Sequence, residues 1–326
     1  MKAVLCRDYG LPDTLAFSEV PIPTLTDSEV LIQVKAVGIN FPDVLIIQNK
    51  YQFKPALPFS PGGEVSGIIH AVGKNVSHLK VGDSVIALCG WGGLAEFVSV
   101  KASRVFTIPN GLNFIEGAGT LYTYGTSYHA LKDRAELKSG ETLLVLGAGG
   151  GVGLAAVQLG KIMGATVIAA ASSNDKLEVC KKMGAHHVIN YSTEDLRARI
   201  KEITAERGVD VIYDPVGGSL AEQALRSIAW KGRYLVVGFA SGNIPSFPAN
   251  LPLLKGASII GVFWGSFAER EPEKSAQNFS QLTTWIKEGK INQHIHKIYS
   301  LEQAPQALQD LIDRKITGKA IVQIAG

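Results

Sequence analysis

The chain has 326 residues, 46% of them hydrophobic, and a formal net charge of +3. This length predicts two domains, and the scattered Lys and Arg residues argue against a nucleic-acid surface. No apolar run approaches the ~20 residues that span a bilayer, and the N-terminal residues lack the pattern of a signal peptide. Cys6, Cys89 and Cys180 are far apart, which disfavours a disulfide framework or a cysteine-based zinc site and indicates a cytoplasmic location.

The first part of the chain, residues 1 to about 110, is expected to form many short strands with glycine turns, typical of a small barrel-like β domain. Val30–Val37 alternates apolar and polar residues, as a half-buried strand does. A short helix is expected to start at Asn40-Phe41-Pro42-Asp43, with Pro42 in its first turn. Further strands are expected at Glu64–Val72, Ser84–Leu88 and Ala95–Val100.

From Leu121 onward helical and strand patterns alternate, which indicates a doubly wound parallel sheet. The expected strands are Thr142–Leu146, Thr166–Ala171, His187–Asn190, Val209–Tyr213, Arg233–Val237 and Ser258–Val262. The expected helices between them are Leu154–Met163, Lys176–Met183, Glu194–Thr204 and Leu220–Ile228. The tail is predicted to continue with helix Gln277–Lys287, strand Ile291–Tyr299, helix Pro305–Arg314 and strand Ala320–Ile324.

A glycine cluster directly follows the first strand of this second part. The strict G-x-G-x-x-G spacing is not met, because Val152 stands at the last position, but Gly147, Gly150 and Gly153 satisfy G-x-x-G-x-x-G. A strand, a glycine turn, a helix and a second strand form a βαβ unit, in which the glycines and the free N–H groups of the helix can bind a pyrophosphate. The alternative is a tight turn that holds no ligand.

The end of the second strand indicates which dinucleotide would bind. A site for NAD usually has Asp or Glu there, whereas this strand ends at Ala171 and is followed by Ser172, Ser173 and Lys176. Two hydroxyls and a cation suit a 2′-phosphate, so the sequence predicts NADPH. Ser172 or Ser173 could instead cap the next helix, and both roles are compatible because a helix N-terminus also attracts an anion.

Several motifs together carry a family resemblance that covers essentially the whole chain. They are Gly38-Ile39-Asn40-Phe41-Pro42-Asp43, Pro61-Gly62-Gly63-Glu64, Gly147 to Gly153, Gly184-Ala185 with Val188-Ile189-Asn190-Tyr191, and Gly238-Phe239-Ala240-Ser241-Gly242. This chain resembles the zinc-free quinone oxidoreductase branch of the medium-chain dehydrogenase/reductase superfamily. The resemblance implies an α/β protein in which a doubly wound parallel Rossmann sheet, residues 123–267, is inserted in a GroES-like, mainly β catalytic domain, residues 1–122 plus 268–326. It also implies a homodimer.

Zinc-dependent members of that superfamily carry a Cys before the first short helix and a Gly-His-Glu motif. This sequence reads Gly38-Ile39-Asn40 at the first place and Gly62-Gly63-Glu64 at the second. We therefore expect no metal, and we interpret His294 and His296 as a solvated strand face. Without zinc as a Lewis acid, the favoured substrates are quinones and alkenes conjugated to a carbonyl, because a few hydrogen-bond donors can stabilise the oxygen that gains charge.

The resemblance also assigns site residues. It implies that Asn40, Asp43, Tyr51 and Thr126 lie near the nicotinamide and are the catalytic candidates, with Asp43 in a structural or orienting role; a second tyrosine of some relatives is Leu45 here. Asn40 could instead cap the short helix, Asp43 could be a first-turn charge favoured by the helix dipole, and Lys319 could be a surface lysine. The candidate cofactor contacts are Gly147, Gly150, Gly151, Val152, Gly153, Ser172, Ser173, Lys176, Tyr191, Gly238, Phe239, Phe263, Trp264 and Lys319.

Three functional hypotheses follow from these residues. The first is an NADPH-dependent quinone reductase that transfers hydride without a metal. The second is an NADPH-dependent reductase of enones, acrylates or enoyl thioesters, which needs the same hydride donor and the same kind of oxygen-stabilising pocket. The third is an NADPH-binding protein with a structural or sensing role, which would need the glycines, Ser172, Ser173 and Lys176 but not Tyr51.

Overall fold

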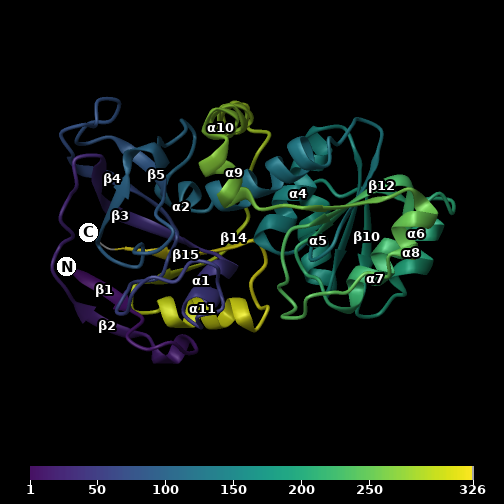
Figure 1. Ribbon diagram of the computed structural model, residues 1–326, viewed down its shortest axis with the longest axis horizontal. Helices are drawn as coiled ribbons and strands as arrows, with labels where there is room; N and C mark the ends of the chain where they lie inside the picture. Colours follow the sequence, from purple (N-terminus) through teal and green to yellow (C-terminus); the bar gives the residue numbers. More distant parts are fainter. Residues whose placement is uncertain (325–326) are drawn as a thin grey trace. The chain divides into compact units, whose positions relative to one another are not determined.

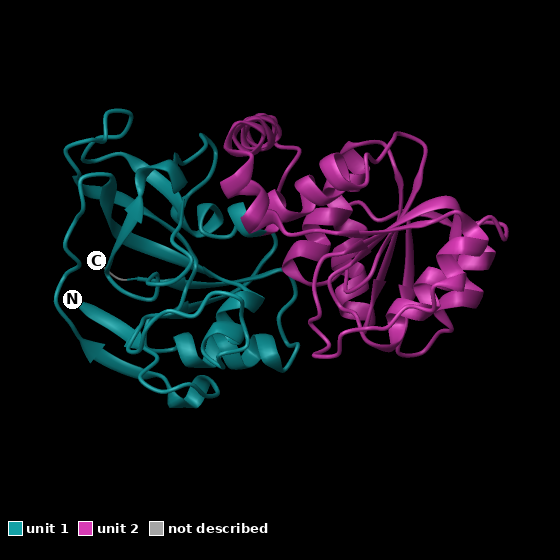
Figure 2. Ribbon diagram, viewed as in Figure 1, with its two compact units in different colours: residues 1–122, 293–326 teal, residues 123–292 magenta. Residues whose placement is uncertain are grey.

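The computed structural model describes residues 1–324, and the chain divides into two compact units (Figure 2). Unit 1 comprises Met1–Tyr122 and Gln293–Gly326, and unit 2 comprises Thr123–Asn292. The first division falls at the boundary expected from the sequence. The second falls after Asn292 rather than after residue 267, so residues 268–292 belong to the unit that contains the parallel sheet.

Contacts of two helices explain this difference. Helices α9 (Trp264–Arg270) and α10 (Pro272–Lys287) pack on the helical stretch around residues 126–134 of the same unit. The Phe267 ring stacks on the His129 ring with their centroids 3.9 Å apart. The Asn278 side-chain amide donates a 2.7 Å hydrogen bond to the Asp133 carboxylate. The sequence pattern shows that 277–287 is helical but not which sheet it accompanies.

Unit 1 is built on a seven-stranded sheet in the order β14-β15-β3-β4-β5-β7, with β6 also paired to β3, beside a β1-β2 ribbon. Its strands are β1 (Lys2–Leu5), β2 (Ala16–Glu19), β3 (Glu29–Ile39), β4 (Glu64–Val72), β5 (Ser84–Leu88), β6 (Phe97–Lys101), β7 (Val105–Thr107), β14 (Ile295–Ser300) and β15 (Lys319–Gln323). Its α-helices are α1 (Phe41–Ile46), α2 (Phe114–Gly117) and α11 (Ala304–Ile312), and short 3₁₀ turns occupy Pro12–Thr14 and Ala102–Arg104.

The long strand β3 is the centre of unit 1. It pairs with β4, β6 and β15, and its apolar residues are buried on both faces, which is why it extends beyond the predicted Val30–Val37. Strand β15 comes from the end of the chain and pairs antiparallel to β3, with Ala320 opposite Ile39. This pairing places Lys319, the first residue of β15, beside Asn40 at the end of β3.

Unit 2 contains a six-stranded, wholly parallel sheet in the order β10-β9-β8-β11-β12-β13. Its strands are β8 (Thr142–Val145), β9 (Thr166–Ala171), β10 (His187–Asn190), β11 (Val209–Asp214), β12 (Ile228–Val236) and β13 (Ser258–Gly261). Its helices, besides α9 and α10, are α3 (Thr126–Tyr128), α4 (Gly151–Ile162), α5 (Asn174–Met183), α6 (Leu196–Ile203), α7 (Ser219–Arg226) and α8 (Asn250–Lys255). π-helical stretches occupy Leu121–Gly125 and His129–Arg134.

Helices cover both faces of this parallel sheet, as its apolar strands require. Residues of α6, α7 and α8 share one core cluster with one face of the sheet, and Figure 1 shows these helices grouped on one side and α4 on the other. Helix α4 can lie close because Gly160 faces the side chains of Leu143 and Val167. The doubly wound fold predicted from the alternation is therefore confirmed.

Several element boundaries differ from the prediction. Helices α4 and α5 begin at Gly151 and Asn174, earlier than predicted, because Gly150 and Ser173 are their N-cap residues. Strand β12 begins at Ile228, which the sequence pattern assigned to the preceding helix. Strands β1 and β2 and helices α8 and α9 were not predicted, since each is short and lacks a clear period.

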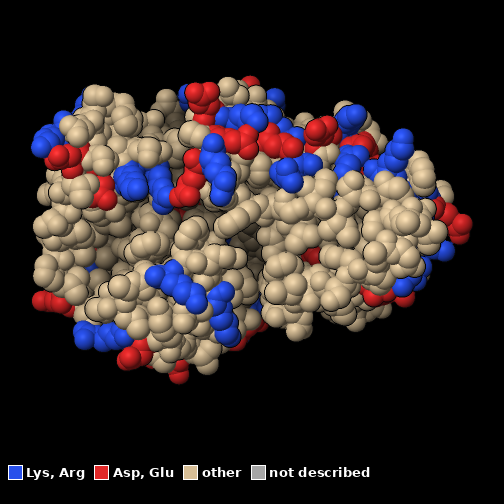
Figure 3. Space-filling model, viewed as in Figure 1, with Lys and Arg blue, Asp and Glu red and all other residues tan. Residues whose placement is uncertain are grey.

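Two surface properties bear on partners. On the face in view in Figure 3, Lys and Arg side chains form several separate groups, with acidic side chains beside many of them. Within residues 1–324, no helix combines the length and the apolar character needed to cross a membrane.

Candidate functional site

The glycine turn joins β8 to α4 at the carboxyl end of the parallel sheet. Gly147 adopts a positive φ of 56°, and a Cβ on Gly153 would collide with the Gly147 carbonyl oxygen, so both positions require glycine. Gly150 is the N-cap of the 12-residue helix α4, and a Cβ there would meet no atom closer than 3.5 Å. The turn thus presents open backbone beside a helix N-terminus, which is the arrangement that binds a phosphate anion.

The side chain of Lys176 lies along this turn. A Cβ built on Gly149 would be 2.8–3.0 Å from the Cβ, Cγ and Cδ atoms of Lys176. Lys176 belongs to the first turn of α5, whose N-cap residue is Ser173. The Ser173 hydroxyl makes no capping hydrogen bond, so the capping alternative does not account for it. The stem of a basic side chain therefore lies along the glycine turn, although the two segments are far apart in sequence.

The other residues expected around the nucleotide gather at the same sheet edge. Ala171, at the end of β9, is buried, and its carbonyl oxygen accepts a 3.1 Å hydrogen bond from the Tyr191 backbone N–H. The Ser192 hydroxyl donates to the Ser172 carbonyl oxygen at 2.9 Å. These two bonds hold the loop after β10 against the end of β9. The uncharged tip of β9 is therefore surrounded by Ser172, Ser173, Lys176 and Tyr191.

Further candidates follow the neighbouring strands of unit 2. The backbone N–H of Gly238, just after β12, contacts the Asp214 carbonyl oxygen at 3.3 Å. The Phe239 ring lies against Gly217, where a Cβ would be 3.1 Å from its Cδ1 atom. These residues line the carboxyl edge of the sheet, which is where doubly wound folds bind ligands.

Thr126 opens α3 next to the first turn of α4. The neighbouring Ser127 hydroxyl donates to the Val152 carbonyl oxygen at 2.9 Å, which ties α3 to the glycine-turn helix. The Trp264 indole is buried against Gly125, whereas Phe263 is 48% exposed. The structure therefore brings Thr126, Val152 and Trp264 together, but it places Phe263 at the surface of the described chain.

Unit 1 holds a buried polar cluster formed by Asn40, Glu64 and Lys319. Glu64 is completely buried, and Lys319 is only 4% exposed. The Lys319 ammonium donates to the Asn40 Oδ1 atom at 2.7 Å and to the Ile39 carbonyl oxygen at 3.0 Å, and it lies 3.4 Å from Glu64 Oε2. Lys319 is therefore not a surface lysine, and that alternative is wrong.

The Asn40 side chain is fully engaged in this cluster. Its Nδ2 group donates to the Gly38 carbonyl oxygen at 3.0 Å and to Glu64 Oε2 at 2.9 Å, while its Oδ1 atom accepts from Lys319. Asn40 is also the N-cap residue of α1 and forms a capping box with Asp43. The helix cap expected as an alternative is therefore present, and the same side chain belongs to the buried cluster as well.

Asp43 orients the same region from within α1. Its carboxylate is buried and accepts hydrogen bonds from the backbone N–H groups of Asn40, at 2.8 Å, and of Gly63, at 3.0 Å. Burial raises the pKa of Asp43 to about 6, and the nearby Lys319 charge opposes that rise. Asp43 thus holds the backbone at two motifs.

Two tyrosines adjoin these carboxylates. Tyr51 is half-buried, packs edge-on against Phe53 and has a pKa raised by burial and by Asp43. Tyr122, which sequence reasoning did not single out, donates its backbone N–H to Glu64 Oε1 at 3.0 Å. A Cβ on Gly63 would lie 3.2 Å from the Tyr122 hydroxyl and 2.9 Å from the Gly90 carbonyl oxygen. The sequence held one signal that could have pointed to Tyr122: it lies four residues before Thr126, which the family resemblance assigns to the site.

Metal-ligating side chains do not gather in this way. Across the part of the chain that the structure describes, residues 1–324, no group of three or more His, Cys, Asp or Glu side chains could hold a metal ion. The Cys89 thiol donates to the Gly62 carbonyl oxygen at 3.2 Å, and burial raises its pKa.

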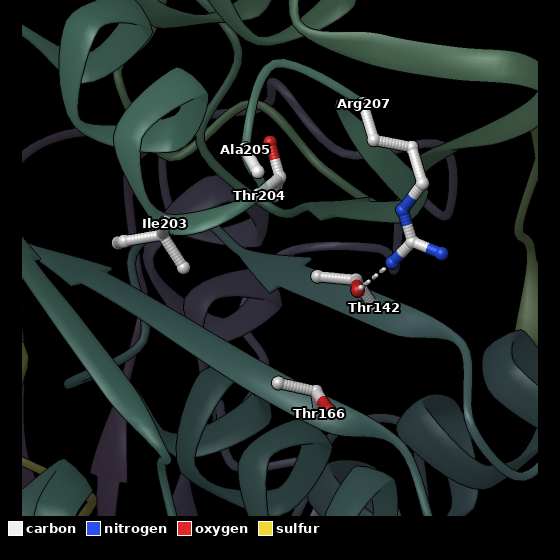
Figure 4. A pocket seen from close by; sticks show the side chains of 6 residues that line it. All are labelled: Thr142, Thr166, Ile203, Thr204, Ala205 and Arg207. Carbon is white, nitrogen blue, oxygen red and sulfur yellow. Dashed lines mark hydrogen bonds between the residues drawn. The ribbon is translucent and has the colours of Figure 1, made fainter.

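A pocket of about 470 Å³ lies elsewhere in unit 2 (Figure 4). Its lining includes Thr142 and Thr166, the first residues of β8 and β9, and Arg207, which donates to the Thr142 hydroxyl at 3.1 Å. The pocket is thus at the amino ends of these strands, at the opposite edge of the sheet from the glycine turn. We do not assign the nucleotide to it.

The chain combines a mainly β unit with a parallel sheet whose glycine turn is suited to bind a nucleotide. This combination defines a class of two-domain dehydrogenases. Comparisons with known proteins agree with that assignment. Residues 26–110 match the family model of the alcohol dehydrogenase GroES-like domain, and residues 151–284 match that of zinc-binding dehydrogenases. A relative named quinone oxidoreductase-like protein 2 homolog, from Nematostella vectensis, is 38% identical over 98% of this chain and 88% of its own length.

Two solved structures show the same architecture. Escherichia coli quinone oxidoreductase, complexed with NADPH, has a TM-score of 0.93 and 29% identity over 99% of this chain and 100% of its own. The CurK enoyl reductase has a TM-score of 0.89 and 29% identity over 99% of both chains. This chain therefore belongs to the quinone oxidoreductase branch of the medium-chain dehydrogenase/reductase superfamily.

Proposed function

We propose that this chain is an NADPH-dependent oxidoreductase that reduces a quinone without using a metal ion. The observation that carries the proposal is the nucleotide site of unit 2, where the Lys176 stem lies along the glycine turn beside a strand tip that has no carboxylate. The structure described with NADPH in the comparisons supports the same cofactor.

The residues at the sheet edge fit NADPH. The backbone around Gly150 and the N-terminus of α4 would hold the pyrophosphate, because both are open and rich in N–H groups. Lys176 and Ser173 would hold the 2′-phosphate, since a cation and a helix N-terminus both favour an anion. When bound, NADPH supplies a hydride.

Metal-independent chemistry is supported by how Glu64 and Asn40 are bonded. A metal ion at this position would have to compete with the Lys319 ammonium, which already donates to Asn40 and lies 3.4 Å from Glu64. Such a buried carboxylate needs a cation close to it, and the lysine provides one. Position 63 also leaves no room for a larger ligand, because even a Cβ there would lie 2.9 Å from the Gly90 carbonyl oxygen.

The side chains of unit 1 then have a defined task. A quinone that accepts hydride at carbon develops negative charge on an oxygen, and a hydrogen-bond donor aimed at that oxygen stabilises it. Tyr51 is the candidate donor, because burial and Asp43 raise the pKa of its phenol and keep it protonated. We propose a positioning role for Asn40 and Asp43, whose polar atoms are bonded within the fold.

Reduction of a carbon–carbon double bond conjugated to a carbonyl is the second candidate. The likeness to the CurK enoyl reductase, with 29% identity and a TM-score of 0.89, favours it specifically. Both reactions need hydride at carbon and a stabilised oxygen, so the same residues would serve either.

A substrate panel tests these proposals. Purified protein is mixed with NADPH and, separately, with quinones, enones and enoyl thioesters, while the nicotinamide absorbance at its near-ultraviolet band is followed. Faster turnover of quinones supports the first proposal, and faster turnover of enones or thioesters supports the second. Tight binding of NADPH without turnover of any acceptor would overturn both and favour a binding protein. Added chelator should leave turnover unchanged.

We also propose that the chain forms a homodimer through the edge of its parallel sheet. Strand β13 is an outer strand, and its Ile259 side chain is 38% exposed. Beside it, Leu253 and Leu254 of α8 are 76% and 66% exposed, and Trp230 is 67% exposed and lies against Gly256 after α8. An apolar, unpaired edge strand favours association, and pairing with a second copy would bury all four side chains.

A further inference from the structure

Asn40 is unable to serve as a donor to a substrate without losing bonds inside the protein. Both hydrogens of its Nδ2 group are directed to acceptors, the Gly38 carbonyl oxygen and Glu64 Oε2, at 3.0 and 2.9 Å. Its Oδ1 atom faces an ammonium at 2.7 Å. Turning the amide toward a ligand would take one hydrogen bond from the buried Glu64 and one from the buried Lys319, which costs free energy. The oxygen-stabilising site therefore needs another donor besides Tyr51.

The phenol of Tyr122 is placed to be that donor. The Glu64 carboxylate that binds the Asn40 amide through Oε2 also binds the Tyr122 backbone N–H through Oε1, at 3.0 Å. The Tyr122 hydroxyl stands over Gly63, 3.2 Å from where a Cβ would be. Gly63 is itself held by a 3.0 Å hydrogen bond from its N–H to Asp43. The Tyr122 backbone is thus held by Glu64, and its hydroxyl adjoins a glycine that Asp43 holds.

The same phenol shares its surroundings with Tyr51. Burial raises the pKa of Tyr122 well above its ordinary value, and Tyr51 and Asp43 are the next causes. Tyr122 therefore remains a protonated donor at neutral pH. It also belongs to a π-helical stretch, Leu121–Gly125, and π-helical turns occur frequently at functional sites. The hydroxyl adjoins Gly63, which carries no side chain that could cover it.

We propose that Tyr122 is a second catalytic hydrogen-bond donor, which stabilises, together with Tyr51, the substrate oxygen that gains negative charge during hydride transfer. This inference rests on the proposed reductase function and adds a residue to it. The phenol donates a hydrogen bond and keeps its proton, so no further co-reactant is required. The loss of this donor should matter most for an acceptor of low reactivity, such as an enone, and least for a quinone.

Three variants test the inference: Tyr122→Phe, Tyr51→Phe and, as a control, Tyr9→Phe, which removes an exposed phenol of unit 1. Loss of one such donor can lower kcat by about 10²–10³. We expect Tyr122→Phe to lower kcat for an enone by about 10²-fold and for a quinone by less. The dissociation constant for NADPH and the thermal unfolding temperature should stay at the parent values, and Tyr9→Phe should turn over like the parent.

Unchanged kcat in Tyr122→Phe with every acceptor would overturn the inference, and so would an effect confined to NADPH binding. If the variant does not fold, 3-fluorotyrosine at position 122 keeps the hydroxyl and makes it more acidic. A donor role predicts that kcat for an enone at neutral pH then rises, because a more acidic phenol is a stronger hydrogen-bond donor, and an unchanged kcat would overturn it. A parent protein that binds NADPH but reduces no acceptor would instead refute the proposed function.

Discussion

Replacing Lys176 by methionine tests the nucleotide site most directly. The substitution removes the ammonium but keeps most of the stem, which fills the space over Gly149. Lys176→Ala would remove the stem as well and would confound charge with packing. Lys182→Met is a suitable control, because Lys182 is exposed in the last turn of the same helix, away from the glycine turn.

The magnitude follows from the charge on the ligand. A hydrogen bond to a charged group contributes about 1.5–3 kcal/mol, and about 1.4 kcal/mol is tenfold in affinity. Removing the ammonium should therefore weaken NADPH binding by about 10- to 100-fold. Lys176 is only half-buried, so solvent screening favours the lower end of that range, and the difference should shrink further at high salt. NADH lacks the 2′-phosphate and should bind nearly as it does to the parent.

Fluorescence titration with NADPH and with NADH, at low and at high ionic strength, measures these four constants for each protein. Equal weakening of both nucleotides in Lys176→Met would show that the lysine supports the turn rather than the phosphate. A parent protein that prefers NADH would refute the assignment of the 2′-phosphate of NADPH to the strand tip after Ala171.

Three further predictions concern stability and assembly. Lys319→Met leaves the buried Glu64 uncompensated and should lower the free energy of unfolding by about 3–5 kcal/mol, measured by urea denaturation, whereas the exposed Lys315→Met should stay within about 0.5 kcal/mol. Burial raises the pKa of Asp43 from its ordinary 3.8 to about 6, so its contribution to stability should fall by about 2 kcal/mol between pH 4 and pH 7; Asp43→Asn should lack this part of the slope, and identical slopes would contradict it. Ile259→Lys should convert a dimer into a monomer in light scattering, and a monomeric parent would refute the interface.

The features that were predictable from the sequence are local or periodic ones. Strands β4, β5, β9 and β10 have the predicted bounds, because turn residues punctuate short apolar runs. The glycine turn and the expected phosphate residues were also found at one sheet edge, since a βαβ unit brings the ends of consecutive strands together. Lys176 could be assigned to this edge because it lies about one helical turn beyond the end of the strand.

Contacts between distant segments were not predictable in this way. Lys319 comes beside Asn40 only because β15 pairs with β3, and nothing in the local sequence of a strand-opening lysine indicates burial. The proposed role of Tyr122 was hidden for a related reason. Its backbone N–H bonds to Glu64, and its hydroxyl adjoins Gly63, both of which are distant in the sequence. Neither contact produces a periodic pattern in the sequence.

The chemistry that this cluster can support follows from its charges. Lys319 already serves as the cation for Glu64 and Asn40, so it is not available to polarise a substrate oxygen. The donors that we propose are phenols whose pKa values burial raises, which makes them weak acids and moderate donors. Moderate donors suffice where the acceptor is already electrophilic, because little charge must be stabilised on its oxygen. The proposed order of reactivity is therefore quinones first, conjugated enones next and simple ketones last. A Lewis-acid metal in place of the ammonium would raise the reactivity of simple ketones and narrow that difference, because it polarises a carbonyl oxygen.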